Sequence, residues 1–133
     1  MDLKNTHKDN LSDIFEKRIS FMNLIEKKFP NTYPDLHSKK IDLSNKTFQK
    51  MCREVALKGV EEMFEALGHL KNWKPHRETD VPEFDKEEFL EEIVDAFNYF
   101  LSLLILIGVD EKDFIEAFNK KDLIIRERIN SGY

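Results

Sequence analysis

The feature that most constrains the fold is a stretch of 15 residues, Ile93 to Ile107, that is apolar almost throughout (IVDAFNYFLSLLILI). As a helix it is about 22 Å long, at roughly 1.5 Å per residue. A bilayer's hydrocarbon core is about 30 Å thick, and the stretch also contains Asp95 and Asn98. We therefore expect a buried helix of a water-soluble protein and no membrane partner.

Helical spacing extends over the rest of the chain. Apolar residues recur at intervals of three, four and seven, and no strand-like alternation of useful length is present. Ser44 or Asn45 can cap the second segment, and Gly108 followed by Asp110 is typical of one helix end and the next N-cap. The predicted helices cover about residues 11–29, 46–70, 87–107 and 111–129. We predict an all-α chain, one domain over residues 1–133, with a fold like a four-helix bundle.

Apolar faces on the first three segments predict what packs. Leu11, Ile14, Phe15, Met22, Ile25 and Phe29 form one stripe, and Ala56, Val60, Met63, Leu67 and Leu70 form another. The third segment is apolar on most of its faces, so either its own chain or a second copy must cover it. A small four-helix domain covers one helix less fully than this, so we predict that dimerisation completes the bundle, as a homodimer or a tetramer.

Charge and cysteine content limit the partners and the compartment. The 133 residues include 21 Lys and Arg and 26 Asp and Glu, for a net charge of −5. A general nucleic-acid binder needs a basic surface, so we expect no nucleic-acid polymer, although a small phosphate ligand is compatible with this charge. Cys52 cannot form an internal disulfide, and the first ten residues are polar with no signal-like segment. These features favour the cytoplasm.

Two pairs of acids suggest a metal site. Glu92 and Asp95 are three residues apart, so they share a helix face, and Glu62 and Glu65 have the same spacing. Such pairs on neighbouring helices could bring four carboxylates together, where two divalent cations would offset their charge. Oxygen ligands alone suit Mg²⁺ or Mn²⁺. The alternative is that both pairs lie on solvated faces.

A di-iron centre is disfavoured. It requires Glu-x-x-His on two helices, whereas the third segment has no histidine and His69 follows Glu65 by four residues. We expect His69 to be a residue at a helix end.

A cationic and aromatic segment, HLKNWKPHR, follows the second helix. Lys71, Lys74 and Arg77 next to a carboxylate–metal cluster would suit a polyphosphate substrate. Trp73 could stack on a base or cover the end of the bundle. A second basic group, near the C-terminus, could close over the same ligand: Lys120, Lys121, Arg126 and Arg128.

Four motifs follow one another along the chain: Glu62-Met-Phe-Glu65, Lys71-Asn-Trp73-Lys74, Glu91-Glu92-Ile-Val-Asp95 with FNYFLSLLILIG after it, and the ending KDLIIRERINSGY. Their order resembles that of the all-α nucleoside triphosphate pyrophosphohydrolases. Within them it is most similar to the dimeric dUTPase branch, whose relatives include MazG-like enzymes and phage dCTPase/dUTPases. The ending resembles that branch's K-N-x-x-N-x-x-R-Q-x-x-G-Y pattern. The resemblance covers roughly Asn10 to the end of the chain.

The resemblance implies hydrolysis of a deoxynucleoside triphosphate to the monophosphate and pyrophosphate, by water attack on the α-phosphorus. It implies that Mg²⁺ is bound by Glu62, Glu65, Glu92 and Asp95, that Lys71, Lys74 and Arg128 face the phosphates, and that Trp73 and Asn98 lie near the nucleoside. Glu65 or Glu62 would be the catalytic residue that orients or deprotonates the water. Because Glu61 and Glu91 are also acidic, the register of each pair is open by one residue.

Departures from the family pattern leave the base open. Arg18 stands where the branch usually has a Gln that reads uracil, and Asp122 and Ile125 replace two asparagines of the ending. A dUTP substrate is therefore one expectation, and dCTP or a purine dNTP is the alternative. A different class also remains: a non-catalytic helical module for dimerisation or regulation.

Overall fold

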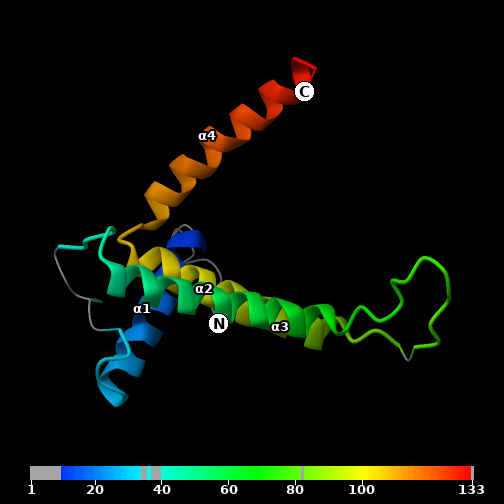
Figure 1. Cartoon of the computed structure of the whole chain (residues 1–133), viewed down its shortest axis with the longest axis horizontal. Helices are drawn as coiled ribbons and strands as arrows, with labels where there is room; N and C mark the ends of the chain where they lie inside the picture. Colours follow the sequence, from blue (N-terminus) through cyan, green and yellow to red (C-terminus); the bar gives the residue numbers. More distant parts are fainter. Residues whose placement is uncertain (1–9, 34–35, 37–39, 82, 133) are drawn as a thin grey trace, which may run out of the picture. The chain divides into compact units, whose positions relative to one another are not determined.

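The computed structural model describes residues 10–33, 36, 40–81 and 83–132 (Figure 1). Within these ranges it has four helices: α1 (Asn10–Lys28), α2 (Lys46–Leu67), α3 (Lys86–Leu106) and α4 (Glu111–Asn130). None of the described residues is in a strand, so the all-α prediction is confirmed. The polar N-terminal segment up to residue 9 and Tyr133, the end of the C-terminal motif, lie outside the described residues.

Local hydrogen bonds explain where the helices begin. The side chain of Asn45 accepts from the backbone N–H of Phe48 at 2.9 Å and so caps α2. Asp110 and Asp113 form a reciprocal capping box at the start of α4. Both caps were expected from the sequence. The second helix ends at Leu67 with Gly68 as its C-cap, three residues before the predicted end at Leu70.

The described chain divides into two compact units, and the boundary falls inside α3. The first unit, residues 1–37 and 104–133, contains α1 and α4; the second, residues 38–103, contains α2 and most of α3. In the first unit Phe15, Arg18 and Met22 are buried on α1, and no residue of α4 is buried. The predicted α1 stripe is wrong at Ile14 and Phe29, which are exposed. A single domain over the whole chain stays a prediction.

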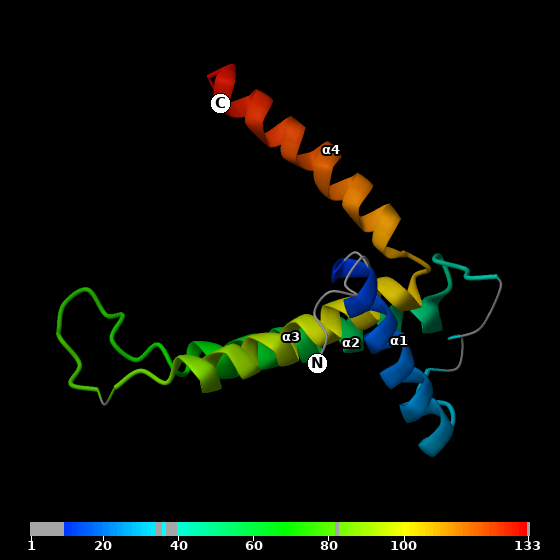
Figure 2. The same cartoon turned by 180° about the vertical axis from the view of Figure 1, so that it is seen from behind.

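The second unit is built on a helical hairpin, in which α2 and α3 lie side by side (Figures 1 and 2). The buried residues of α2 are Phe48, Val55, Gly59 and Ala66. A Cβ atom added at Gly59 would lie 2.7 Å from Cε1 of the Phe100 ring. The α2 row that contains Val55, Gly59 and Ala66 therefore faces α3, and glycine is needed where the ring meets the α2 backbone.

The outward faces of this hairpin are apolar. Large apolar side chains at least 40% exposed are Leu57, Val60, Phe64 and Leu67 on α2 and Leu90, Val94 and Phe97 on α3. The predicted α2 face is therefore wrong at Val60 and Leu67, because the packed row lies one residue earlier and uses small side chains that let the helices approach. The described chain also leaves part of α3 uncovered.

No single helix among the described residues is both long and apolar enough to cross a membrane. The pair α3 and α4, which a break separates, meets the criteria of length and composition when the two helices are taken together.

Candidate metal centre on the helical hairpin

Three carboxylates converge between α2 and α3. One oxygen from each of Glu62, Glu65 and Glu92 can be chosen so that all three atoms lie within 4.8 Å of one another. Glu62 follows Gly59 by three residues and so continues the α2 row that faces α3. Glu92 precedes the buried Ala96 by one turn of α3. The helix pair that packs the hairpin therefore also brings the acids together.

Burial and like charge disfavour the ionised form of Glu62. Its pKa is raised, first because the group is partly removed from water, next by a side-chain hydrogen bond with Glu65, and then by repulsion from Glu65, Asp95 and Glu92. Glu62 and Glu92 are half-buried and Glu65 is exposed. A cation at this point would replace the proton that the cluster otherwise favours.

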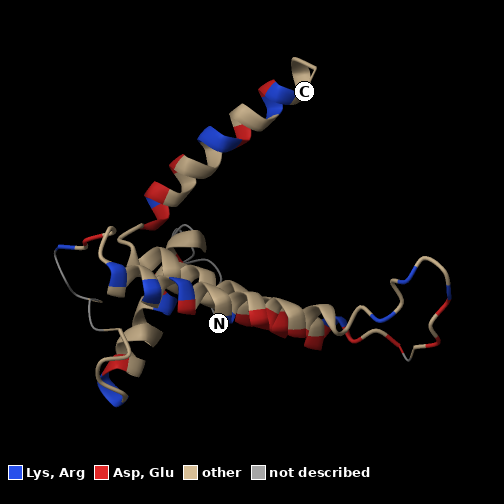
Figure 3. Cartoon of the chain, in the orientation of Figure 1, with Lys and Arg blue, Asp and Glu red and all other residues tan. Residues whose placement is uncertain are grey.

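The geometry distinguishes between the two possible registers. Glu61 and Glu91 are exposed and are not members of the three-carboxylate group, whereas Glu62 and Glu92 are. Neighbouring residues point about 100° apart around a helix, so only one residue of each adjacent pair can face the other helix. Figure 3 shows the acidic residues along the half of the hairpin nearer its connecting loop.

Asp95 differs from its expected setting. We predicted a carboxylate enclosed in apolar sequence, but Asp95 is exposed and lies outside the three-carboxylate group, although its charge still acts on Glu62. The buried neighbour is Ala96, and Asp95 is turned away from it by about 100°. Its role as a fourth ligand stays a prediction.

The basic segment lies in the connection between the two helices, where Lys71, Trp73 and Lys74 are all exposed. Trp73 is 69% exposed, so it does not cover the end of the hairpin, and the Nζ atom of Lys74 lies 5.8 Å from the centre of its ring. Stacking on a base stays a prediction for this residue.

Aromatic rings stabilise the base of this connection. His69 follows directly on the C-cap of α2, as expected for a residue at a helix end, and its ring makes an edge contact with Phe89 of α3 at 6.2 Å. The centre of the Phe84 ring lies 5.3 Å from the centre of the Phe89 ring. His69 is therefore part of an aromatic contact and is not in the acidic group.

The remaining predicted residues lie elsewhere. Asn98 is half-buried on α3. Arg128 is exposed in the last turn of α4, in the other compact unit, together with Lys120, Lys121 and Arg126. Arg126 pairs with Asp122 at 2.8 Å. Arg18 is buried on α1, with its guanidinium carbon 4.6 Å from the centre of the Phe21 ring. A shared ligand for these groups stays a prediction.

Two residues that matter here were missed from the sequence. A glycine in the middle of a helix is a known sign of close packing, and Gly59 could have been found that way. Asn72 forms hydrogen bonds across the connecting loop to Glu78 and Thr79, and no spacing rule indicates such bonds.

The donor set fits a hard cation. Glu62, Glu65 and Glu92 offer only carboxylate oxygens, which suit Mg²⁺ or Mn²⁺ and not a thiophilic metal. A divalent ion would offset the mutual repulsion of these carboxylates.

Comparison with known proteins gives little further information. No protein-family model matches the chain, and no solved structure matches it. Over 70 residues, 50% of this chain, it is 39% identical to the isoleucine–tRNA ligase of Sulfurihydrogenibium sp. (strain YO3AOP1), a match that covers 8% of the ligase. The chain therefore spans a small part of that protein's length.

Proposed function

We propose that this chain is a Mg²⁺-dependent nucleoside triphosphate pyrophosphohydrolase, similar to dUTP diphosphatase, with Mn²⁺ as a possible substitute. The observation that carries the proposal is the convergence of Glu62, Glu65 and Glu92 between two helices, in the register of the E-x-x-E and E-x-x-D motifs. The ordered motifs of the sequence support the same activity.

The chemistry assigns each group a task. Bound at the carboxylates, Mg²⁺ would lower the pKa of a water and offset the charge of the phosphates. Glu65 or Glu62 would orient that water or take its proton as the water oxygen bonds to the α-phosphorus. The bond from the α-phosphorus to the bridging oxygen then breaks, which yields the nucleoside monophosphate and pyrophosphate. Asp95 would complete the ligand set.

Substrate binding falls to the basic and aromatic groups. Lys71 and Lys74 would hold the phosphates, and Trp73 and Asn98 would contact the nucleoside. The phosphate contact that the family resemblance implies for Arg128 stays a prediction. We propose dUTP as the first candidate substrate. A dCTP or purine dNTP substrate is the alternative, because Arg18 replaces the usual uracil-reading Gln.

The activity is tested by incubating the chain with each dNTP and NTP in Mg²⁺ and measuring pyrophosphate release. We expect release from at least one dNTP, with the monophosphate as the second product. Glu92→Gln, prepared in parallel, controls for a contaminating phosphatase. If no nucleotide in the panel yields pyrophosphate with Mg²⁺ or Mn²⁺, the enzyme proposal is overturned and the non-catalytic helical module is favoured.

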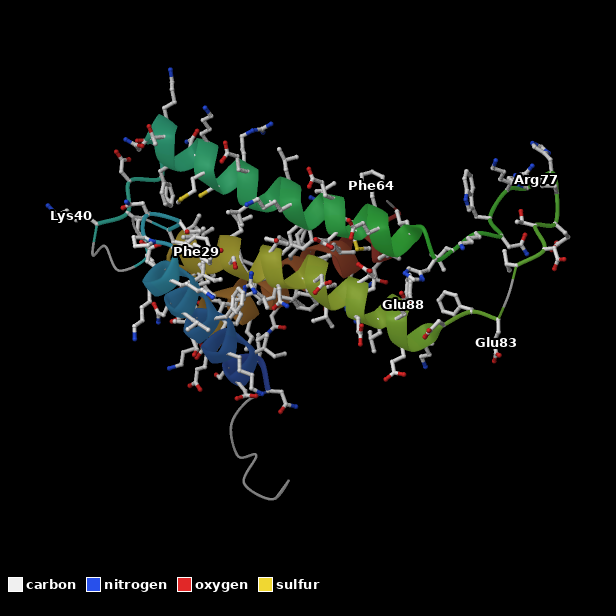
Figure 4. All side chains as sticks on the ribbon, turned by 90° about the horizontal axis from the view of Figure 1, so that it is seen from below. Phe29, Lys40, Phe64, Arg77, Glu83 and Glu88 are labelled. Atoms are coloured by element: carbon white, nitrogen blue, oxygen red, sulfur yellow. The ribbon has the colours of Figure 1, made fainter. Side chains whose placement is uncertain are left out.

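We also propose that two copies associate through the outward apolar faces of the hairpin. Phe64 is 68% exposed and points away from α3 (Figure 4), and Phe97 on α3 is 59% exposed. Large apolar side chains exposed on both helices suit an interface, which would remove them from water. Sedimentation should give a dimer or tetramer, and Phe64→Asp should shift it toward the monomer. Leu24→Asp, at a similarly exposed α1 position, is the matched control.

A further inference from the structure

The connection between α2 and α3, from Gly68 to Asp85, is long for a helical hairpin. Connections between packed helices usually have about 2–8 residues, and longer loops without regular structure are often functional. Its outgoing limb carries Lys71, Lys74 and Arg77, and its return limb carries only acidic charges, Glu78, Asp80, Glu83 and Asp85 (Figure 3). Arg77 and Glu83 mark the two limbs in Figure 4.

One side chain connects these limbs. Nδ2 of Asn72 donates to Oε2 of Glu78 at 2.9 Å, and Oδ1 of Asn72 accepts from the backbone N–H of Thr79 at 3.0 Å. Within the described part of the loop, no other side chain hydrogen-bonds from one limb to the other. Asn72 lies between Lys71 and Trp73, so this pair of bonds fixes the backbone that carries both.

We propose that Asn72 is a positioning residue, which holds Lys71, Trp73 and Lys74 in the arrangement that receives the phosphates and the base. The identity of that ligand rests on the proposed function. The amide is suited to the task because it has a donor for the Glu78 carboxylate and an acceptor for the Thr79 N–H. Aspartate at position 72 would instead place its carboxylate against the carboxylate of Glu78.

The effect of losing this connection follows from populations. If the arranged loop becomes a minor state, the apparent dissociation constant rises by the inverse of its population. Two hydrogen bonds at an exposed site correspond to about a tenfold change. Asn72 touches no carboxylate of the metal cluster, so the rate at saturating substrate should not change.

The only tryptophan of the chain is Trp73, so its fluorescence reports on this loop alone. We would titrate the wild type and Asn72→Ala with α,β-imido-dUTP and Mg²⁺, and in parallel measure kcat and KM with dUTP. The expected result for Asn72→Ala is a Kd and a KM raised by about tenfold with kcat unchanged. Wild-type values of Kd and KM would overturn the proposal, and so would a loss confined to kcat.

A rescue variant separates positioning from general damage. Asn72→Asp alone should weaken binding, whereas Asn72→Asp with Glu78→Gln lets the amide at 78 donate to the carboxylate at 72. That double variant should return to within about twofold of wild type, as expected for a directly coupled pair. Failure of the rescue would contradict the proposed contact. If Asn72→Ala does not fold, the comparison of Asn72→Asp with the double variant tests the positioning role in its place.

A separate readout distinguishes failure of the substrate assignment. If the analogue does not bind the wild type, the assignment of dUTP as the substrate is in error, and the fluorescence anisotropy decay of Trp73 in the ligand-free protein then decides the loop question. Faster local motion of Trp73 in Asn72→Ala than in wild type supports the positioning role. Equal motion in the two proteins overturns it.

Discussion

The two halves of the α2–α3 hairpin use the same helix row for opposite purposes. At Gly59 the row has no side chain and the Phe100 ring lies against the α2 backbone. One turn later the same row carries Glu62, whose carboxylate faces Glu65 and Glu92. Close packing stabilises the first half, whereas like charges oppose one another in the second. Packing at one end of the hairpin can therefore hold together, at the other end, groups that would separate by themselves.

The acidic half should therefore be needed for activity and not for folding. We expect Glu92→Gln to abolish pyrophosphate release, a loss of about a thousandfold, because it removes one carboxylate of the cluster. The ligand-free variant should fold and melt at or above the wild-type temperature, since repulsion at Glu62 is relieved. Asp95→Asn tests the fourth acid in the same assay.

Glu91→Gln is the matched control, because Glu91 is the neighbouring acid, exposed and outside the cluster. It should keep wild-type activity. Normal turnover in Glu92→Gln would contradict the assignment of the acidic half as the site.

A divalent ion should make the two halves more alike by removing the repulsion. An ion that binds only the folded state stabilises that state by about 2.7 kcal/mol when its concentration is 100 times the Kd. Melting curves with and without Mg²⁺ should show this shift in wild type and Glu91→Gln, and a much smaller one in Glu62→Gln. An equal response in all three proteins would mean that the ion acts elsewhere.

The sequence predicted the helices better than their faces. The caps at Asn45 and Asp110 are local features, because each depends on residues within one turn. Which row of α2 faces α3 depends on the partner helix, and the apolar pattern indicated a row one residue away from the packed one. Small residues such as Gly59 and Ala66 carry little hydrophobic signal although they allow the closest approach.

The candidate site shows the same division. The spacing within the pairs Glu62/Glu65 and Glu92/Asp95 was sufficient to propose that their carboxylates converge, since residues three apart share a helix face. Three of the four do so, and Asp95 lies outside the group. Adjacent acids at 61 and 91 could not be separated without knowing the facing helix. The hydrogen bonds of Asn72 join loop positions six and seven residues apart, and no periodic rule covers an irregular loop.

The packed half can be tested by adding a single methyl group. Alanine in place of a helical glycine normally stabilises by about 1 kcal/mol, but Gly59→Ala would place Cβ at 2.7 Å from the Phe100 ring. We expect a net destabilisation of about 1 kcal/mol, because overpacking outweighs helix propensity. Urea denaturation measures the change.

Two controls locate the cause of that change. Lys58→Ala, at the exposed neighbouring position, should have little effect on the free energy of unfolding. In a Phe100→Leu background the added methyl should cost less, since the smaller side chain leaves room. A stabilising Gly59→Ala would show that the two helices do not meet closely at this point.

The smallest expected effect is a pH dependence of the ligand-free protein. Because the pKa of Glu62 is raised in the folded state, that state binds the proton more tightly than the unfolded chain does. This group's contribution to the free energy of unfolding therefore falls as pH rises from about 4.3, the usual Glu pKa, through the raised value. Asp42 and Asp110 act in the opposite direction, since hydrogen bonds lower their pKa values.

The difference between wild type and Glu62→Gln isolates this contribution, because the other carboxylates titrate in both proteins. With a chelator present, melting temperatures are measured from about pH 4 to 7. The melting temperature of the wild type should fall further below that of Glu62→Gln as pH rises. Added Mg²⁺ should reverse the sign in wild type, since the ion binds the deprotonated carboxylates. Parallel pH profiles in the two proteins would mean that Glu62 does not experience the repulsion that distinguishes the acidic half of the hairpin from the packed half.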